Sequence, residues 1–276
     1  MHPAYIFAFL FFILGAIVGS FLNVVVLRLG TGLPPTGRSQ CFSCGKRLGV
    51  FDLIPIFSFL ALLGRCRYCG ARISIQYPIV EALTAFTFLL IYLKFESAFF
   101  SPSIFIIGEV LLVLIISSLL IAITAYDVRH KIIPNSLVFW FIGLSAAVAL
   151  GRLGAQAPFE FSSFLILDLL AGPILFLFFY ALWKISKGRW MGLGDGKLAL
   201  GIGLSLGFVS GLSATVVGFW IGAAFGVSLM LISKVLPLIS LKGESIAVTM
   251  RTEIPFAPFL ILGMAVVYFF GINVLG

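Results

Sequence analysis

Long apolar stretches separated by short polar segments make up most of the chain. The first, residues 5–27, is too long for the apolar region of a cleavable signal peptide, so we expect it to remain as a transmembrane helix. Further stretches are expected to span at residues 79–93, 104–125, 137–150, 164–183, 214–232 and 256–272, with a short glycine-rich stretch at 198–212. A bilayer core takes about 20 helical residues. The pattern predicts an all-α membrane protein with about eight transmembrane helices.

Composition and charge agree with a membrane protein. The 276 residues are 61% hydrophobic and only 10% charged, whereas soluble domains carry about 25% charged residues. All lysines and arginines except Lys94 and Arg152 lie in four polar segments, at residues 28–77, 126–136, 184–197 and 233–254. Basic loops favour the cytoplasmic side, so these segments are expected there. The net charge of +8 then reflects topology and contact with membrane lipids, and gives no reason to invoke nucleic acid.

The four cysteines all lie in the one sizeable polar segment, residues 30–77. They form two C-x2-C pairs, Cys41 with Cys44 and Cys66 with Cys69. Four thiolates commonly hold a structural zinc ion, and Gly45 and Gly70 follow the pairs where a tight turn favours positive φ. Two disulfides or metal-free thiols are the alternatives, although cytoplasmic thiols stay reduced. The apolar run between the pairs, residues 51–64, is expected to form a re-entrant or interfacial helix.

Two aspartates lie where apolar stretches meet basic segments. Asp127 follows the stretch at 104–125, and Asp195 lies among glycines in Gly-Leu-Gly-Asp-Gly-Lys. A carboxylate at the membrane edge is costly, so two on one membrane face suggest a pair that shares a proton. In an aspartic protease, one carboxylate takes a proton from water while the other, protonated, hydrogen-bonds the scissile carbonyl.

Each aspartate also has a simpler interpretation. Asp127 can be an interfacial anchor paired with a neighbouring base, and Asp195 can be an acid in the first turn of a helix, near the positive dipole end. The sequence has neither a Gly-x-Ser-x-Gly elbow nor a His-Glu-x-x-His motif. Together, the two aspartates favour the proteolytic interpretation.

Several motifs, taken in their order, resemble the bacterial prepilin peptidases, also called type IV leader peptidases. The resemblance covers nearly the whole chain, and one small departure is Ser43, where many members have proline in or before the first cysteine pair. The motifs are residues 19–28, the cysteine pairs, 52–55, 64–67, 73–81, Asp127 with residues 133–135, and 192–197.

The resemblance implies a bacterial inner-membrane enzyme with two activities. Such enzymes remove the short basic leader of type IV prepilins and pseudopilins at the cytoplasmic face, and many then methylate the new N-terminus with S-adenosylmethionine. By matching motifs, Asp127 and Asp195 are the expected catalytic pair. The tetracysteine segment is associated with methyl transfer in two-function members, and its presence favours both activities here. Expected substrate or methyl-transfer positions are Glu81, Gly192, Gly194 and Lys197.

The implied organisation has three parts: a first transmembrane helix at 1–29, a cytoplasmic zinc domain at 30–77, and a transmembrane peptidase bundle at 78–276. One alternative is a presenilin-like intramembrane protease, which would place its aspartates deeper within the spans and would not need a tetracysteine loop. Another is a zinc-stabilised transporter or assembly scaffold, with the acids as proton-relay groups.

Overall fold

The computed structural model describes residues 3–32, 34, 36–99, 103–155, 163–239 and 254–274, and its regular structure there is helical, apart from two isolated β-bridges. The main helices are α1 (Pro3–Arg28), α3 (Gln76–Phe99), α4 (Ile104–His130), α5 (Asn135–Ala155), α6 (Ser163–Ser186), α7 (Leu193–Leu206), α8 (Phe208–Ile239) and α9 (Ala257–Phe270). They lie at or beside the eight apolar stretches, which confirms the predicted all-α fold.

Helix length separates six of these helices from the other two. Within the described residues, α1, α3, α4, α5, α6 and α8 are long and apolar enough to cross a membrane. Helices α7 and α9 have 14 residues each, fewer than the roughly 20 of a full span. The predicted boundary near residue 213 is wrong, because the helix breaks at Gly207, whose φ of 83° ends α7 before α8 begins.

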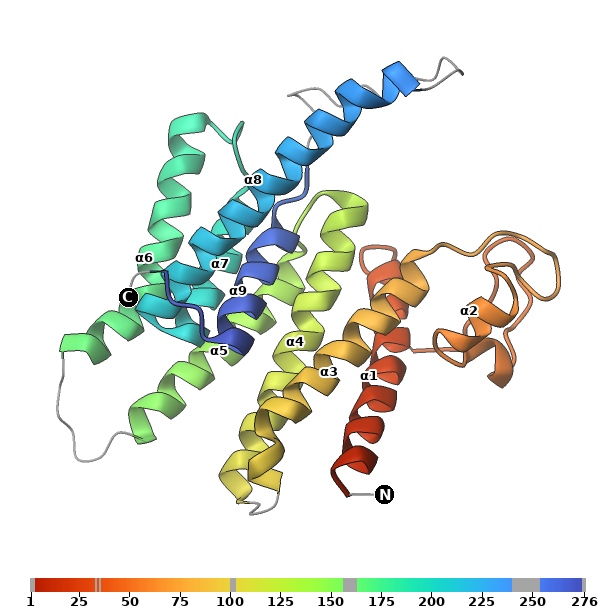
Figure 1. The fold of residues 1–276 in the computed structure, drawn as a ribbon, viewed down its shortest axis with the longest axis horizontal. Coiled ribbons are helices and arrows are strands. Elements are labelled where there is room, and N and C mark those ends of the chain that lie inside the picture. The colour runs from red at the N-terminus through yellow and green to blue at the C-terminus, as the bar shows by residue number, and fades with distance from the viewer. Residues whose placement is uncertain are drawn as a thin grey trace. The chain divides into compact units, whose positions relative to one another are not determined.

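The chain folds as two compact units, residues 1–125 and 126–276, and α4 contributes to both. In unit 1, α1 and α3 lie side by side (Figure 1). A Cβ on Gly15 would lie 2.7 Å from the Ala85 Cα, and one on Gly19 would lie 2.7 Å from the Glu81 Cα. Glycine therefore permits the close approach of these two helices. The division into 1–29, 30–77 and 78–276 stays a prediction.

The segment between α1 and α3 stands beside the helix pair, and α2 lies within it (Figure 1). The predicted single helix over 51–64 is wrong. A 3₁₀ helix, η1 (Val50–Leu53), and a five-residue helix, α2 (Phe57–Ala61), replace it. The interruption falls at Pro55 and Ile56, where proline removes an amide donor and Ile56 takes a φ of 62° that no α-helix contains.

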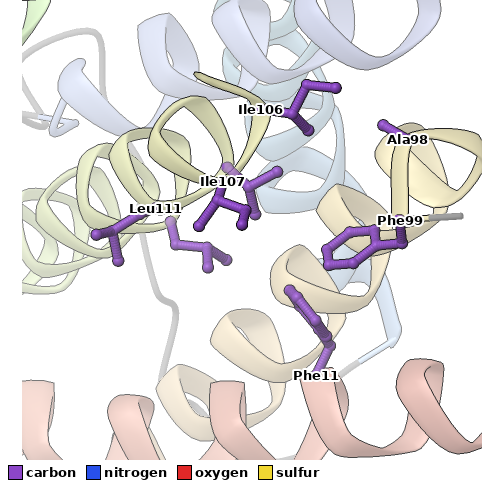
Figure 2. Close-up of a pocket in the computed structure, with 8 residues that line it drawn as sticks. Phe11, Ala98, Phe99, Ile106, Ile107 and Leu111 are labelled. Atoms are coloured by element: carbon purple, nitrogen blue, oxygen red, sulfur yellow. The ribbon is translucent and has the colours of Figure 1, made fainter. Parts of the chain in front are cut away.

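Unit 1 also contains a pocket of about 210 Å³ whose lining is entirely apolar (Figure 2). Its lining residues are Phe11, Ala98, Phe99, Ile106, Ile107, Val110, Leu111 and Leu114. Side chains of this kind supply no acid, base or metal ligand. The candidate catalytic and metal-binding residues therefore lie outside this pocket.

Helix α7 is the centre of unit 2, because it packs against α5, α6, α8 and α9. Its glycines make room for these neighbours. A Cβ on Gly203 would lie 2.6 Å from the Gly172 amide nitrogen of α6, and one on Gly201 would overlap the Phe141 ring of α5. The short, glycine-rich helix is therefore buried inside the unit, and Asp195 lies in its first turn.

We expect Gly203→Ala to lower the thermal unfolding midpoint of the detergent-solubilised protein. Its Cβ would meet the α6 backbone, which cannot move aside as a flexible side chain can, and overpacking of this kind typically costs about 1–3 kcal/mol. Gly143→Ala in α5 is the matched control, because a Cβ there meets nothing within 4 Å. Equal midpoints for the two variants would contradict the packing described for α7.

Candidate active site and metal centre

Asp127 lies in the last turn of α4 and is 4% exposed. Its carboxylate accepts a hydrogen bond from the backbone amide of Ala257, the first residue of α9. The Oδ2 atom is buried and has no hydrogen-bond partner among the described residues. A buried carboxylate oxygen without a donor is costly, which makes this atom the natural acceptor for a water molecule or a substrate group.

Asp195 lies at the third position of α7 and is 7% exposed. The backbone amide of Gly192 donates to its Oδ2 at 3.1 Å, so the acid caps the helix start as the simpler interpretation expects. Burial and the nearby negative charge of Asp127 raise the pKa of Asp195 to about 7, against the opposing effect of the Gly192 amide. The negative charge of Asp127 therefore reaches the Asp195 carboxyl.

Contacts between the α4–α5 connection and the start of α7 hold the two aspartates in one region of unit 2. A Cβ on Gly194 would lie 3.0 Å from the Ile133 Cβ, so only glycine fits closely there. The Lys197 ammonium donates to Asn135 Oδ1 at 2.8 Å and lies 5.3 Å from the Phe139 ring centroid. Gly194 and Lys197 therefore contact the segment that follows Asp127 and connect it to the start of α7.

The anchoring interpretation of Asp127 required a neighbouring basic partner. Within the part of the chain that the structure describes, no lysine, arginine or histidine forms an ion pair with Asp127. The Ala257 amide is the donor instead. The described residues therefore do not supply the basic partner that the anchoring interpretation expects, and one oxygen of Asp127 stays unpaired.

The tetracysteine segment consists of two similar turns. Gly45 donates to the Cys41 carbonyl at 2.8 Å and Gly70 to the Cys66 carbonyl at 2.9 Å. Both glycines have positive φ, 68° and 70°, as the sequence predicted. Each turn is closed by one β-bridge, Gln40 with Arg47 and Arg65 with Arg72. The two turns face each other and present their sulfurs to a common point.

The sulfur geometry fits a single metal ion. The four Sγ atoms lie within 4.8 Å of one another, and those of Cys41 and Cys69 are 3.8 Å apart. Tetrahedral zinc with bonds of about 2.3 Å separates its sulfurs by about 3.8 Å. None of the four cysteines, all of which are described, forms a disulfide. Amide hydrogen bonds from Cys44 and Ser43 lower the pKa of Cys41 to about 6, whereas desolvation and the neighbouring thiols raise the pKa of Cys69 to about 11, so without a metal the cluster loses its first proton most readily at Cys41.

Asp52 braces the region between the two turns. Its Oδ1 pairs with Arg67 Nε at 2.6 Å, and its Oδ2 accepts from the Gly49 amide at 3.0 Å. Burial alone would raise the pKa of Asp52, but these hydrogen bonds outweigh burial and hold it below its usual value. The side chain thus joins a residue near the first cysteine pair to a residue within the second.

Glu81 lies in unit 1 with the cysteines, on the first turns of α3, and is 7% exposed. Its Oε2 accepts from the Ile56 amide at 2.7 Å, and the Ser20 hydroxyl also donates to the carboxylate. The predicted positions therefore divide between the units, with Glu81 and the cysteines in unit 1 and the aspartates with Gly192, Gly194 and Lys197 in unit 2.

Two hydrogen bonds in this region were not predicted from the sequence, one to Asp127 and one from Lys197. Ala257 supplies a donor through its backbone, and Asn135 holds Lys197. A signal for the first was available, because Pro255 and Pro258 frame the start of the last apolar stretch, and proline marks helix starts. For Asn135, the sequence offered its place in the motif after Asp127 but no indication of its partner.

The chain matches two models of known protein families. Residues 13–95 match the "Bacterial Peptidase A24 N-terminal domain", and residues 112–227 match the "Type IV leader peptidase family". The first range contains all four cysteines and Glu81, and the second contains both aspartates. Each candidate site therefore falls within a matched region.

Curated relatives cover most of the chain. An Escherichia coli O78:H11 "Type 4 prepilin-like proteins leader peptide-processing enzyme" is 34% identical, with 92% of this chain and 91% of the relative covered. A Bacillus subtilis "Prepilin leader peptidase/N-methyltransferase" is 30% identical over 96% and 94%. A Myxococcus xanthus protein of the same name is 33% identical over 82% of this chain, which spans 64% of that relative. No solved structure matches.

We expect the purified protein to contain about one zinc ion per chain, measured by elemental mass spectrometry, because four thiolates at this separation complete a tetrahedral site. Cys44→Ser and Cys69→Ser, both at exposed positions, should each lower the zinc content. Ser43→Ala is the matched control and should leave it unchanged. Four reactive thiols in protein that contains no metal would contradict the assignment.

Proposed function

The chain belongs to the type IV leader peptidase family, which makes it an enzyme, and we propose that Asp127 and Asp195 are its catalytic pair. The observation that carries this proposal is that two carboxylates within the matched peptidase region are buried and that the charge of one acts on the other. Both lie at helix ends, one in the last turn of α4 and one in the first turn of α7. This placement favours the leader peptidase interpretation over the presenilin-like one, which expects deeper aspartates.

The pair supports water-mediated cleavage of a peptide bond. With the pKa of Asp195 near 7, about half of the molecules carry a proton on Asp195 at pH 7, and a larger share carry it at lower pH. The protonated carboxyl donates to the scissile carbonyl oxygen, and the ionised carboxylate takes a proton from the attacking water. The proton then passes to the leaving amine as the C–N bond breaks. The Ala257 and Gly192 amides each fix one carboxylate and leave its remaining oxygen for this chemistry.

The substrate class follows from the relatives and from the placement of the pair. The printed names of the relatives describe processing of prepilin leaders, so prepilins or pseudopilins are the proposed substrates. A substrate with an apolar helix can enter the bundle and present its cleavage point at the membrane edge. The distribution of lysine and arginine supports a cytoplasmic position for that edge, and the bacterial inner membrane is the proposed location. Gly192, Gly194 and Lys197, beside the pair, are proposed substrate-side positions.

We also propose N-methylation of the new N-terminus, because relatives that cover most of this chain are named peptidase and N-methyltransferase. S-adenosylmethionine would supply the methyl group, whose S–C bond breaks as the N–C bond forms and the amine loses a proton. The tetracysteine segment, held by a structural zinc ion, is the proposed methyl-transfer region. Four cysteine ligands leave no open coordination position, so the ion would stabilise the segment without taking part in the reaction.

We expect Asp127→Asn and Asp195→Asn each to reduce cleavage of a leader-bearing prepilin by on the order of 10³-fold or more, since an amide cannot exchange the required proton. Product mass spectrometry gives the readout. Both variants should keep their zinc and should still methylate a pilin supplied without its leader. Glu109→Gln, at an exposed acid on the same helix as Asp127, is the control and should cleave normally. Cleavage retained by either asparagine variant would remove the pair from the mechanism.

The pH dependence of cleavage should show an alkaline limb centred near pH 7. Burial and the charge of Asp127 raise the pKa of Asp195 to about 7, so the proton that the pair requires is lost as the pH rises through that value. Above it, kcat/KM should fall about tenfold per pH unit. Initial rates between pH 5 and 9, with zinc content checked at each end, provide the measurement. A profile that stays flat to pH 9 would contradict this assignment.

A further inference from the structure

Ile56 occupies the centre of a strained turn between the two cysteine pairs. Its φ is 62° and its ψ is −51°, and the Phe57 amide donates to the Pro55 carbonyl at 2.5 Å. These values describe a three-residue γ-turn with positive φ, a rare and strained arrangement. A β-branched residue at positive φ is a genuine outlier, and strain of this kind persists only where the surroundings enforce it.

The enforcing contact comes from the membrane helix pair. The Ile56 amide donates a hydrogen bond to Glu81 Oε2, with 2.7 Å between the nitrogen and the oxygen. This bond satisfies the backbone donor at the centre of the turn. Glu81 cannot easily shift, because Gly19 of α1 lies directly on its backbone and the Ser20 hydroxyl donates to its carboxylate. Glu81, a buried acid that contacts Gly19 and Ser20 of α1, therefore fixes the conformation of Ile56.

We propose that Glu81 is a positioning residue that docks the tetracysteine segment onto the α1–α3 helix pair through the strained Ile56 amide. Asp52 lies four residues before Ile56 in the same segment and is paired with Arg67 beside Cys66. The contact thereby sets the geometry of the proposed methyl-transfer region, and to that extent the inference rests on the proposed function. In this proposal Glu81 positions the segment and does not touch the substrate.

The existing contacts of Glu81 argue for positioning over proton transfer. A carboxylate that binds the substrate amine or accepts its proton needs an oxygen directed at the substrate. Glu81 instead accepts hydrogen bonds from Ile56 and Ser20, both within the protein. The two roles predict opposite results for glutamine at this position, because glutamine keeps an oxygen acceptor but cannot act as an anionic base.

The first test compares Glu81→Gln with Glu81→Leu. Glutamine should keep methyl transfer to a leaderless pilin within about threefold of wild type, whereas leucine should lower it by about tenfold or more, because the Ile56 amide loses its acceptor. Cleavage by both variants should stay within about threefold. Glu96→Gln, at the far end of the same helix, is the control. A glutamine variant as impaired as the leucine variant would overturn the proposal, and so would an equal loss of cleavage.

The second test asks whether relieving the strain restores activity. Glycine adopts positive φ readily, so Ile56→Gly combined with Glu81→Leu should recover the part of the lost methyl transfer that is due to strain, although the amide at position 56 still lacks its acceptor. Leu63→Gly is the matched control. Leu63 also has positive φ, 51°, in the same segment, but its amide donates to Leu60 and not to Glu81. Recovery with both glycines, or with neither, would contradict a specific link between Glu81 and Ile56.

A structural readout separates this inference from the proposed function. Amide hydrogen exchange in residues 55–62 should become faster in Glu81→Leu and remain near wild type in Glu81→Gln, whether or not the protein methylates pilin. If wild type cleaves but does not methylate, the methyl-transfer proposal fails and the exchange result still decides the docking. Unchanged exchange in the leucine variant would overturn the docking itself.

Discussion

Three buried acidic side chains of this protein are each held by a backbone amide. A carboxylate inside an apolar bundle needs a donor, and basic side chains are costly to bury alongside it. A backbone amide meets the need without adding a second charge, and it ties the acid to a particular turn of the chain. The pairs are Glu81 with Ile56, Asp127 with Ala257 and Asp195 with Gly192.

The sequence predicted the fold class and the helix positions because apolar stretches mark membrane helices directly. It missed the end of α7, since glycine and apolar residues continue through Gly207 and only the backbone conformation there breaks the helix. It missed the split at Ile56 for a similar reason. The run at 51–64 is apolar throughout, but a contact with Glu81, distant in sequence, fixes its conformation.

The sequence predicted the arrangement of the cysteines, but for the aspartates it predicted only the residues and not their contacts. Cysteine spacing alone predicted the cluster, because each turn closes locally and needs only its own glycine. The aspartates were predictable as residues, but their pairing depends on contacts between segments far apart in the chain, such as Lys197 with Asn135. The two family models follow the same division, with the cysteines in the first match and the aspartates in the second.

The amide partner of Asp127 has a consequence for biosynthesis. Ala257 begins α9, so the ribosome makes that donor after the other helices that the structure describes. Until α9 has been synthesised and inserted, Asp127 lacks the hydrogen bond that orients it. A nascent chain therefore reaches the membrane with Asp127 not yet oriented, and the order of translation delays assembly of the two-aspartate site until α9 has been made.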